Sequence, residues 1–307
     1  MTKRIEFGVA LGSKASPYIV KESARICDDS GMNSFWVPET TEYGGFSMLG
    51  YLSSHTKIIT LGSGVVNVYS RYPKTIRMEA RSLFELSNGR FILGIGSSAP
   101  PIIEQWHGIN FDKPIHTMIQ ATKILREGYN GPIYWAAINK MMTELAGKFA
   151  DGVIFFLKPI NVVKQYIKYF NEGTSQSSNY RTKIVSFVPT YISNDKEKAK
   201  DMARITIATY VGGSPFYGQP IMEAGFAESL NKIRNFWVSG DRTLAIKSVP
   251  DEMVYSIAAV GNVDECINTL KDHASVGICN VVATFDLRRH LYNEELLNNL
   301  RKFVDKL

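Results

Sequence analysis

Short apolar runs alternate with amphipathic segments from one end of the chain to the other. The apolar runs are rich in β-branched and aromatic residues, which is typical of strands. We expect eight strands, at residues 5–11, 34–37, 57–66, 91–96, 132–137, 152–156, 182–193 and 278–285. The segments between them have helical periodicity, with Pro17 and Pro73 placed to begin helices and Gly31 and Gly89 placed to end them.

Strands that alternate with helices predict a parallel α/β sheet. Eight of each is the number in a closed (β/α)8 barrel, or TIM barrel, and we predict a single such domain over residues 1–307. The alternative is an open doubly wound sheet, which would place a G-x-G-x-x-G turn directly after the first strand. The sequence there is LGSKASP, so the barrel is favoured. The long segment before the last strand predicts a helical excursion at about residues 205–250.

The composition is that of an ordinary globular chain, with 45% hydrophobic and 21% charged residues. No apolar run approaches the ~18 residues that a membrane-spanning helix needs, and the N-terminus is interpreted as a strand rather than a signal peptide. Three scattered cysteines predict neither a disulfide framework nor a zinc site, so a reducing cytoplasm is expected. The net charge of +6 suits an anionic ligand. Because the basic residues are interspersed with acids, binding of nucleic acid is not expected.

The sequence lacks the common catalytic motifs: it has no G-x-S-x-G elbow, no H-E-x-x-H pair and no phosphate-binding G-x-x-x-x-G-K-[ST] loop. The active site of a barrel lies at the carboxyl ends of its strands. The segments that follow four of the predicted strands are rich in Gly, Ser, Asn and aromatic residues, at 38–43, 64–73, 94–99 and 136–140. That mixture suits a flat heteroaromatic cofactor with a phosphate tail.

Five sequence runs, in order, resemble motifs of the bacterial-luciferase-like superfamily. They are SGMNSFWVPE, KIITLGSGVVNVYSRYP, FELSNGRFILGIGSS, TELAGKFADGVIFF and the C-terminal VPDEMVYSIAAVGNVDECINTLKDHASVGICNVV. The third-strand run, with Asn67 and Tyr69, resembles the methylenetetrahydromethanopterin reductase branch, which uses the deazaflavin coenzyme F420. The resemblance covers nearly the whole chain.

The resemblance implies a luciferase-like barrel that binds FMN or F420 at the carboxyl end of its strands. It implies a cis peptide bond between Gly64 and Val65, behind the flavin ring, and a catalytic role for Glu39 near the reactive edge of the ring or substrate. The remaining cofactor-binding residues that it implies are Asn67 and Tyr69 beside the ring, Gly96, Ser97 and Ser98 along the ribityl chain, and Ala137, Ile138, Asn139 and Lys140 around the phosphate.

Three features depart from the reductase pattern: Ala10 stands where those enzymes have an acid, the phosphate loop AAINK lacks glycine, and the connection from the fourth to the fifth strand is short. Three functions therefore stay open. The first is hydride transfer between F420 and a small organic or pterin-like substrate. The second is an FMN-dependent monooxygenase, and the third is a non-catalytic flavin-binding barrel. The expected partners are a small-molecule substrate and a second copy of the chain, with neither nucleic acid nor membrane.

Overall fold

The computed structural model describes residues 5–11, 15–177, 182–285 and 293–307. Part of the LGSKASP turn, residues 12–14, lies outside the described residues. The strands are β1 (Glu6–Leu11), β2 (Ser34–Val37), β3 (Thr60–Ser63), β4 (Val66–Asn67), β5 (Phe91–Gly96), β6 (Ile133–Ala136), β7 (Gly152–Phe156), β8 (Lys183–Ile192), β9 (Ala259–Gly261) and β10 (Asn280–Phe285).

Eight of these strands close into a parallel barrel. The order is β10-β1-β2-β3-β5-β6-β7-β8, and β8 pairs in turn with β10, which completes the ring. The two short strands are additions: β4 pairs with β5, and β9 extends the end of β8. Because neighbours in the barrel are also successive in sequence, the predicted TIM barrel is confirmed and the open sheet is excluded.

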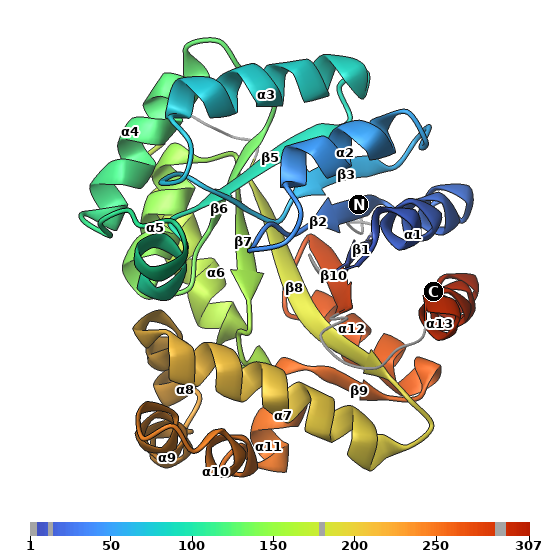
Figure 1. Ribbon diagram of the computed structural model, residues 1–307, viewed down its shortest axis with the longest axis vertical. Helices are drawn as coiled ribbons and strands as arrows, with labels where there is room; N and C mark the ends of the chain where they lie inside the picture. Colours follow the sequence, from blue (N-terminus) through green and yellow to red (C-terminus); the bar gives the residue numbers. More distant parts are fainter. Residues whose placement is uncertain (1–4, 12–14, 178–181, 286–292) are drawn as a thin grey trace.

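Helices surround the barrel (Figure 1). Those that follow the strands are α1 (Pro17–Asp29), α2 (Gly45–Ser53), α3 (Pro73–Leu86), α4 (Pro114–Arg126), α5 (Lys140–Phe149), α6 (Ile160–Thr174), α12 (Val263–Ser275) and α13 (Asn293–Lys306), with a short π-helix at Pro101–Trp106. The excursion is longer than the expected 205–250. It comprises α7 (Lys196–Gly213), a 3-10 turn (Pro215–Tyr217), α8 (Gly218–Glu223), α9 (Ala227–Val238), α10 (Arg242–Lys247) and α11 (Asp251–Ile257).

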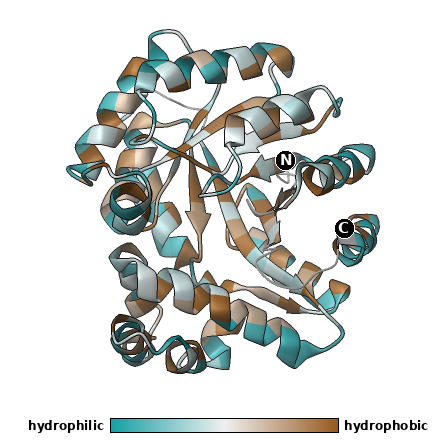
Figure 2. Cartoon of the chain, in the orientation of Figure 1, coloured by the Kyte–Doolittle hydropathy of each residue, from teal (hydrophilic) through white to brown (hydrophobic). Residues whose placement is uncertain are grey.

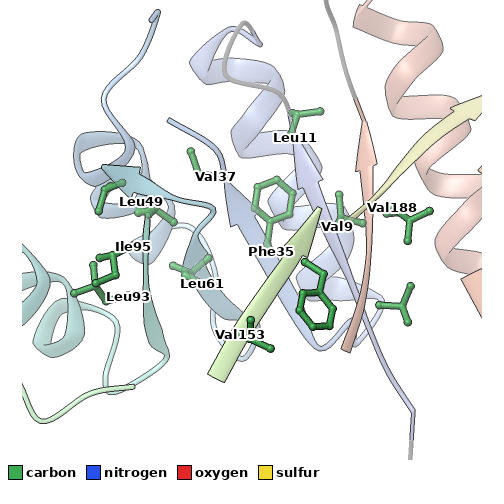
Figure 3. Close-up of a cluster of buried hydrophobic side chains, with 14 of the residues drawn as sticks. Val9, Leu11, Phe35, Val37, Leu49, Leu61, Leu93, Ile95, Val153 and Val188 are labelled. Atoms are coloured by element: carbon green, nitrogen blue, oxygen red, sulfur yellow. The ribbon is translucent and has the colours of Figure 1, made fainter. Parts of the chain in front are cut away.

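Alternate residues of each strand face the two sides of the barrel wall. On β1, Val9 and Leu11 belong to the apolar layer between strands and helices, whereas Ala10 lies in the barrel interior. Figure 3 shows part of that outer layer, including Phe35, Leu93 and Ile95. Hydrophobic residues accordingly concentrate on the strands and hydrophilic ones on the outer helices (Figure 2).

The third strand is shorter than predicted: it begins at Thr60 rather than at residue 57. The backbone N–H groups of Lys57, Ile58 and Ile59 donate instead to the carboxylate of Asp28 at the end of α1. Burial alone would raise the pKa of Asp28, but these three hydrogen bonds and Arg90 outweigh it and hold the pKa below its usual value. The Asp28 carboxylate thus accepts the hydrogen bonds that residues 57–59 would otherwise make to a neighbouring strand.

His273 on α12 generates a prediction about acid stability. The side chain is 1% exposed, neither ring nitrogen has a hydrogen-bond partner among the described residues, and burial lowers its pKa to about 4. The unfolded chain, with the ordinary pKa of 6.5, binds this proton first, so stability falls as the pH drops from 6.5 towards 4. We expect this residue to remove about 2 kcal/mol of unfolding free energy between pH 7 and pH 5.

Urea unfolding at the two pH values measures the effect. His273→Phe should lose this part of the pH dependence, while the same change at exposed His116 should retain it. Equal pH dependence of the His273→Phe variant and the parent would contradict the prediction.

Candidate active site at the carboxyl end of the barrel

A break in the wall between β3 and β4 shapes the barrel mouth. β3 ends at Ser63, the peptide bond between Gly64 and Val65 is cis, and β4 then resumes pairing with β5 through Val66 and Asn67. The cis bond that the resemblance implied is therefore confirmed. Where the ladder is interrupted, the Ser63 hydroxyl donates to the Gly94 carbonyl and accepts from the Gly94 N–H, each at 2.9 Å.

Val65 projects from this break against two glycines of β5. A Cβ atom on Gly96 would lie 2.8 Å from a methyl carbon of Val65 and 3.3 Å from the Cβ of Ala136. A Cβ on Gly94 would lie 2.0 Å from the Ser63 carbonyl oxygen. Real Cβ atoms do not approach so closely, so glycine is required at position 96 beside Val65 and at position 94 beside the Ser63 carbonyl. Beyond Gly96, Ser97 and Ser98 are half-buried, and Ser98 has a positive φ of 60°.

Asn67 and Tyr69 stabilise the loop that follows β4. The Asn67 side-chain oxygen accepts hydrogen bonds from the N–H groups of Tyr69 and Ser70. The Tyr69 hydroxyl donates to the Asp112 carbonyl at 2.5 Å, and its ring stacks on Phe111 at 5.2 Å. Burial raises the pKa of the Tyr69 hydroxyl. Both residues thus lie at the mouth, and their contact with a cofactor ring stays a prediction.

Glu39, which follows β2, has both carboxylate oxygens occupied. Arg71 donates to them in a bidentate pair, at 2.5 and 2.8 Å, and the N–H of Gly45 at the start of α2 donates at 2.7 Å. Glu79 on α3 lies 3.6 Å from the same guanidinium. This cluster ties together the ends of β2 and β4 and two helices. Sequence analysis did not identify Arg71, which is 32 residues from its partner.

The loop after β6 presents backbone donors at the start of α5. Asn139 caps the helix by accepting from the N–H of Met142, and the N–H of Lys140 donates to Gln219 of α8 at 3.3 Å. Within the part of the chain that the structure describes, no acceptor is recorded for the N–H groups of Asn139 and Met141. Ala137 is buried and Ile138 half-buried. The Lys140 ammonium lies over the Tyr169 ring and 3.7 Å from Glu144.

Lys158 is a residue of this region that sequence analysis missed. It follows β7 directly, after Leu157, whose φ of 51° is uncommon for a non-glycine residue. Its side chain is 2% exposed, and Nζ donates to the Ile138 carbonyl at 2.7 Å. The sequence signal was available, because residues just after each strand face the mouth of a barrel.

Aromatic rings line the mouth on the side of the excursion. Phe111 lies between Tyr69 and Phe216, with ring centroids at 5.2 and 5.8 Å. Tyr217, the residue after Phe216, packs against Phe156 at the end of β7 and against Tyr210 of α7. The excursion therefore borders the carboxyl ends of the strands, toward which the arrowheads of β7 and β8 point in Figure 1.

These residues fit a flat ring with an anionic tail. The break at Gly64–Val65 places Val65 against Gly96 at the mouth, where it could support one face of a ring. The start of α5 presents the N–H groups of Asn139 and Met141, which have no recorded acceptor among the described residues, and backbone N–H groups at a helix start bind phosphate. The described residues contain no cluster of side chains that could hold a metal ion. Nor does any helix among them combine the length and apolar character needed to span a membrane.

Comparisons with known proteins agree with this geometry. Residues 4–131 and 120–279 match the family model described as luciferase-like monooxygenase. The 5,10-methylenetetrahydromethanopterin reductase of Archaeoglobus fulgidus is 29% identical over 317 residues, which cover 91% of this chain and 93% of the reductase.

Two solved structures have the same fold. The coenzyme F420-dependent tetrahydromethanopterin reductase of Methanopyrus kandleri has a TM-score of 0.83, at 19% identity and 99% coverage of both chains. The oxygenating constituent of 3,6-diketocamphane monooxygenase of Pseudomonas putida, in complex with FMN, has a TM-score of 0.66 at 13% identity, with 97% of this chain and 96% of that chain covered. On the match of the family model along most of its length, the chain belongs to the luciferase-like monooxygenase family.

Proposed function

We propose that this protein is an oxidoreductase that binds coenzyme F420 at the barrel mouth and serves hydride transfer to or from a small organic or pterin-like substrate. The observation that carries the proposal is Val65 packed against Gly96 at the mouth of a barrel whose α5 begins with two N–H groups that have no recorded acceptor among the described residues. The similarity to F420-dependent reductases supports the choice of cofactor. When bound, the deazaflavin supplies the hydride chemistry.

The chain's own residues orient the reactants and exclude water. Val65 supports one face of the ring, and Ser97 and Ser98 flank its ribityl chain. The N–H groups of Asn139 and Met141 receive the phosphate. The rings of Tyr69, Phe111 and Phe216 give the substrate an apolar wall. A homodimer and a cytoplasmic location stay predictions.

A second candidate function is an FMN-dependent monooxygenase, which the family model and the FMN-bound relative favour. Ala10 is relevant to both candidates, because it is fully buried in the barrel interior and brings no acid to the mouth. A barrel that binds a flavin without catalysis is the third candidate.

Titration of the apo-protein with F420 and with FMN separates these functions. We expect micromolar F420 binding, detected by cofactor fluorescence, much weaker FMN binding, and anaerobic turnover of the bound F420 with a suitable substrate. Preference for FMN together with oxygen consumption would favour the monooxygenase. Binding of neither cofactor would contradict the proposed function.

Lys140 provides a test of the phosphate position. Its side chain is about half exposed, and the contacts recorded for its ammonium within the described chain are with Glu144 and the Tyr169 ring, so it is able to turn towards an anion at the start of α5. We expect Lys140→Ala to weaken F420 binding by about 1 kcal/mol at low salt, because an exposed ion pair is worth little. The loss should disappear at about 0.5 M salt, where screening is strong. An unchanged affinity at low salt would place the phosphate elsewhere.

We propose that Glu39 acts on the ring indirectly. Together with Arg71, it fixes the loops beside the ring. Glu39→Gln and Arg71→Met should each lower the unfolding free energy, and the double variant should lose less than the sum. We expect a coupling energy of about 1–3 kcal/mol from this half-buried bidentate pair, measured by urea unfolding of the four proteins. Strictly additive losses would show that the pair does not stabilise the mouth.

A further inference from the structure

Lys158 places a buried amine against the loop after β6. Its Nζ donates to the Ile138 carbonyl at 2.7 Å and lies 3.2 Å from the centroid of the Tyr166 ring and 4.9 Å from that of Phe155. Among the described residues, the Ile138 carbonyl is the recorded hydrogen-bond acceptor of Nζ, and none of the recorded ion pairs includes Lys158. The contact with Ile138 therefore fixes the position of the amine.

Burial disfavours the charged form of Lys158. It lowers the pKa of the side chain well below the usual value, and Glu223 of α8 only partly opposes this effect. Glu223 itself accepts a hydrogen bond from Gln219. The role of Lys158 therefore depends on the hydrogen bond that Nζ donates, which the neutral amine also makes.

The contact between Lys158 and Ile138 also sets the direction of the next donor. In a trans peptide unit the carbonyl and the following N–H point in opposite directions, and the Ile138–Asn139 bond is trans. Because the Ile138 carbonyl points to Lys158, the Asn139 N–H points away from it. This N–H is one of the two that have no recorded acceptor in the described part of α5 and its loop.

We propose that Lys158 is a positioning residue for a phosphate-bearing cofactor: its Nζ holds the Ile138 carbonyl and thereby directs the Asn139 N–H towards a phosphate bound at the start of α5. The inference rests on the proposed function. In this proposal a buried lysine fixes the backbone of a phosphate loop that lacks glycine.

The test compares ligands with and without the phosphate. The full-length protein is titrated with F420 and with its deazaflavin core, which lacks the phosphodiester and the glutamate tail. Lys158→Met keeps an unbranched side chain of similar length and removes the donor to the Ile138 carbonyl. We expect the dissociation constant for F420 to rise at least tenfold, while that for the core changes less than twofold. The F420 effect should persist at high salt, because it depends on an interior hydrogen bond rather than on an exposed ion pair.

Lys164→Met is the matched control, since Lys164 is exposed on α6, six residues away in sequence. It should leave both dissociation constants unchanged. Lys158→Gln keeps a side-chain N–H donor near the Ile138 carbonyl, so it should lose less F420 affinity than Lys158→Met, again with the core affected less than F420. Circular dichroism and thermal unfolding check that each variant is folded.

Equal loss of F420 and core binding would give Lys158 a structural role only and overturn the inference. Unchanged binding of F420 by the folded variants would overturn it as well. Both results leave the proposed function in place, because the parent still binds the cofactor. If the parent binds neither F420 nor its core, the proposed function itself fails, and the inference with it.

Discussion

Large rings fill the barrel interior because glycines on neighbouring strands leave room for them. Trp36 on β2 faces Gly62, its register partner on β3, and a Cβ there would lie 2.2 Å from the indole ring. Tyr134 has the same relation to Gly152 across β6 and β7, at 2.8 Å. A Cβ on Gly64 would lie 2.6 Å from the ring of Phe187. These pairs of large and small residues close the barrel as a packed core.

The candidate site depends on the same constraint. The candidate site lies at the carboxyl end of the barrel, where Gly64, Gly94 and Gly96 bring no side chains to the wall. Other groups support the backbone there. The Ser63 hydroxyl replaces the missing ladder bonds, and the Glu39–Arg71 pair fixes the neighbouring loops. The mouth is therefore rich in glycine, and these polar side chains hold its shape.

The sequence predicted what depends on local pattern. Strands 34–37, 91–96 and 152–156 have the predicted bounds, and α1 and α3 begin at Pro17 and Pro73 as expected. What it missed depends on distant partners. The start of the third strand is determined by Asp28, about thirty residues earlier. The hydrogen bonds of the Glu39 carboxylate are determined by Arg71, 32 residues later. Neither periodicity nor residue type reveals such pairings, since any exposed acid has the same appearance in a sequence.

The two lysines near the start of α5 differ in what surrounds them. Lys140 opens the helix, and its side chain is about half exposed beside Glu144, so solvent and salt screen its charge. Lys158 follows the next strand and is buried against the loop, where its Nζ donates to the Ile138 carbonyl. A hydrogen bond in the interior holds the direction of its partner more firmly than an exposed ion pair does, because water competes with it far less. In the role that we propose, this hydrogen bond aligns a backbone donor in the AAINK loop, which lacks glycine.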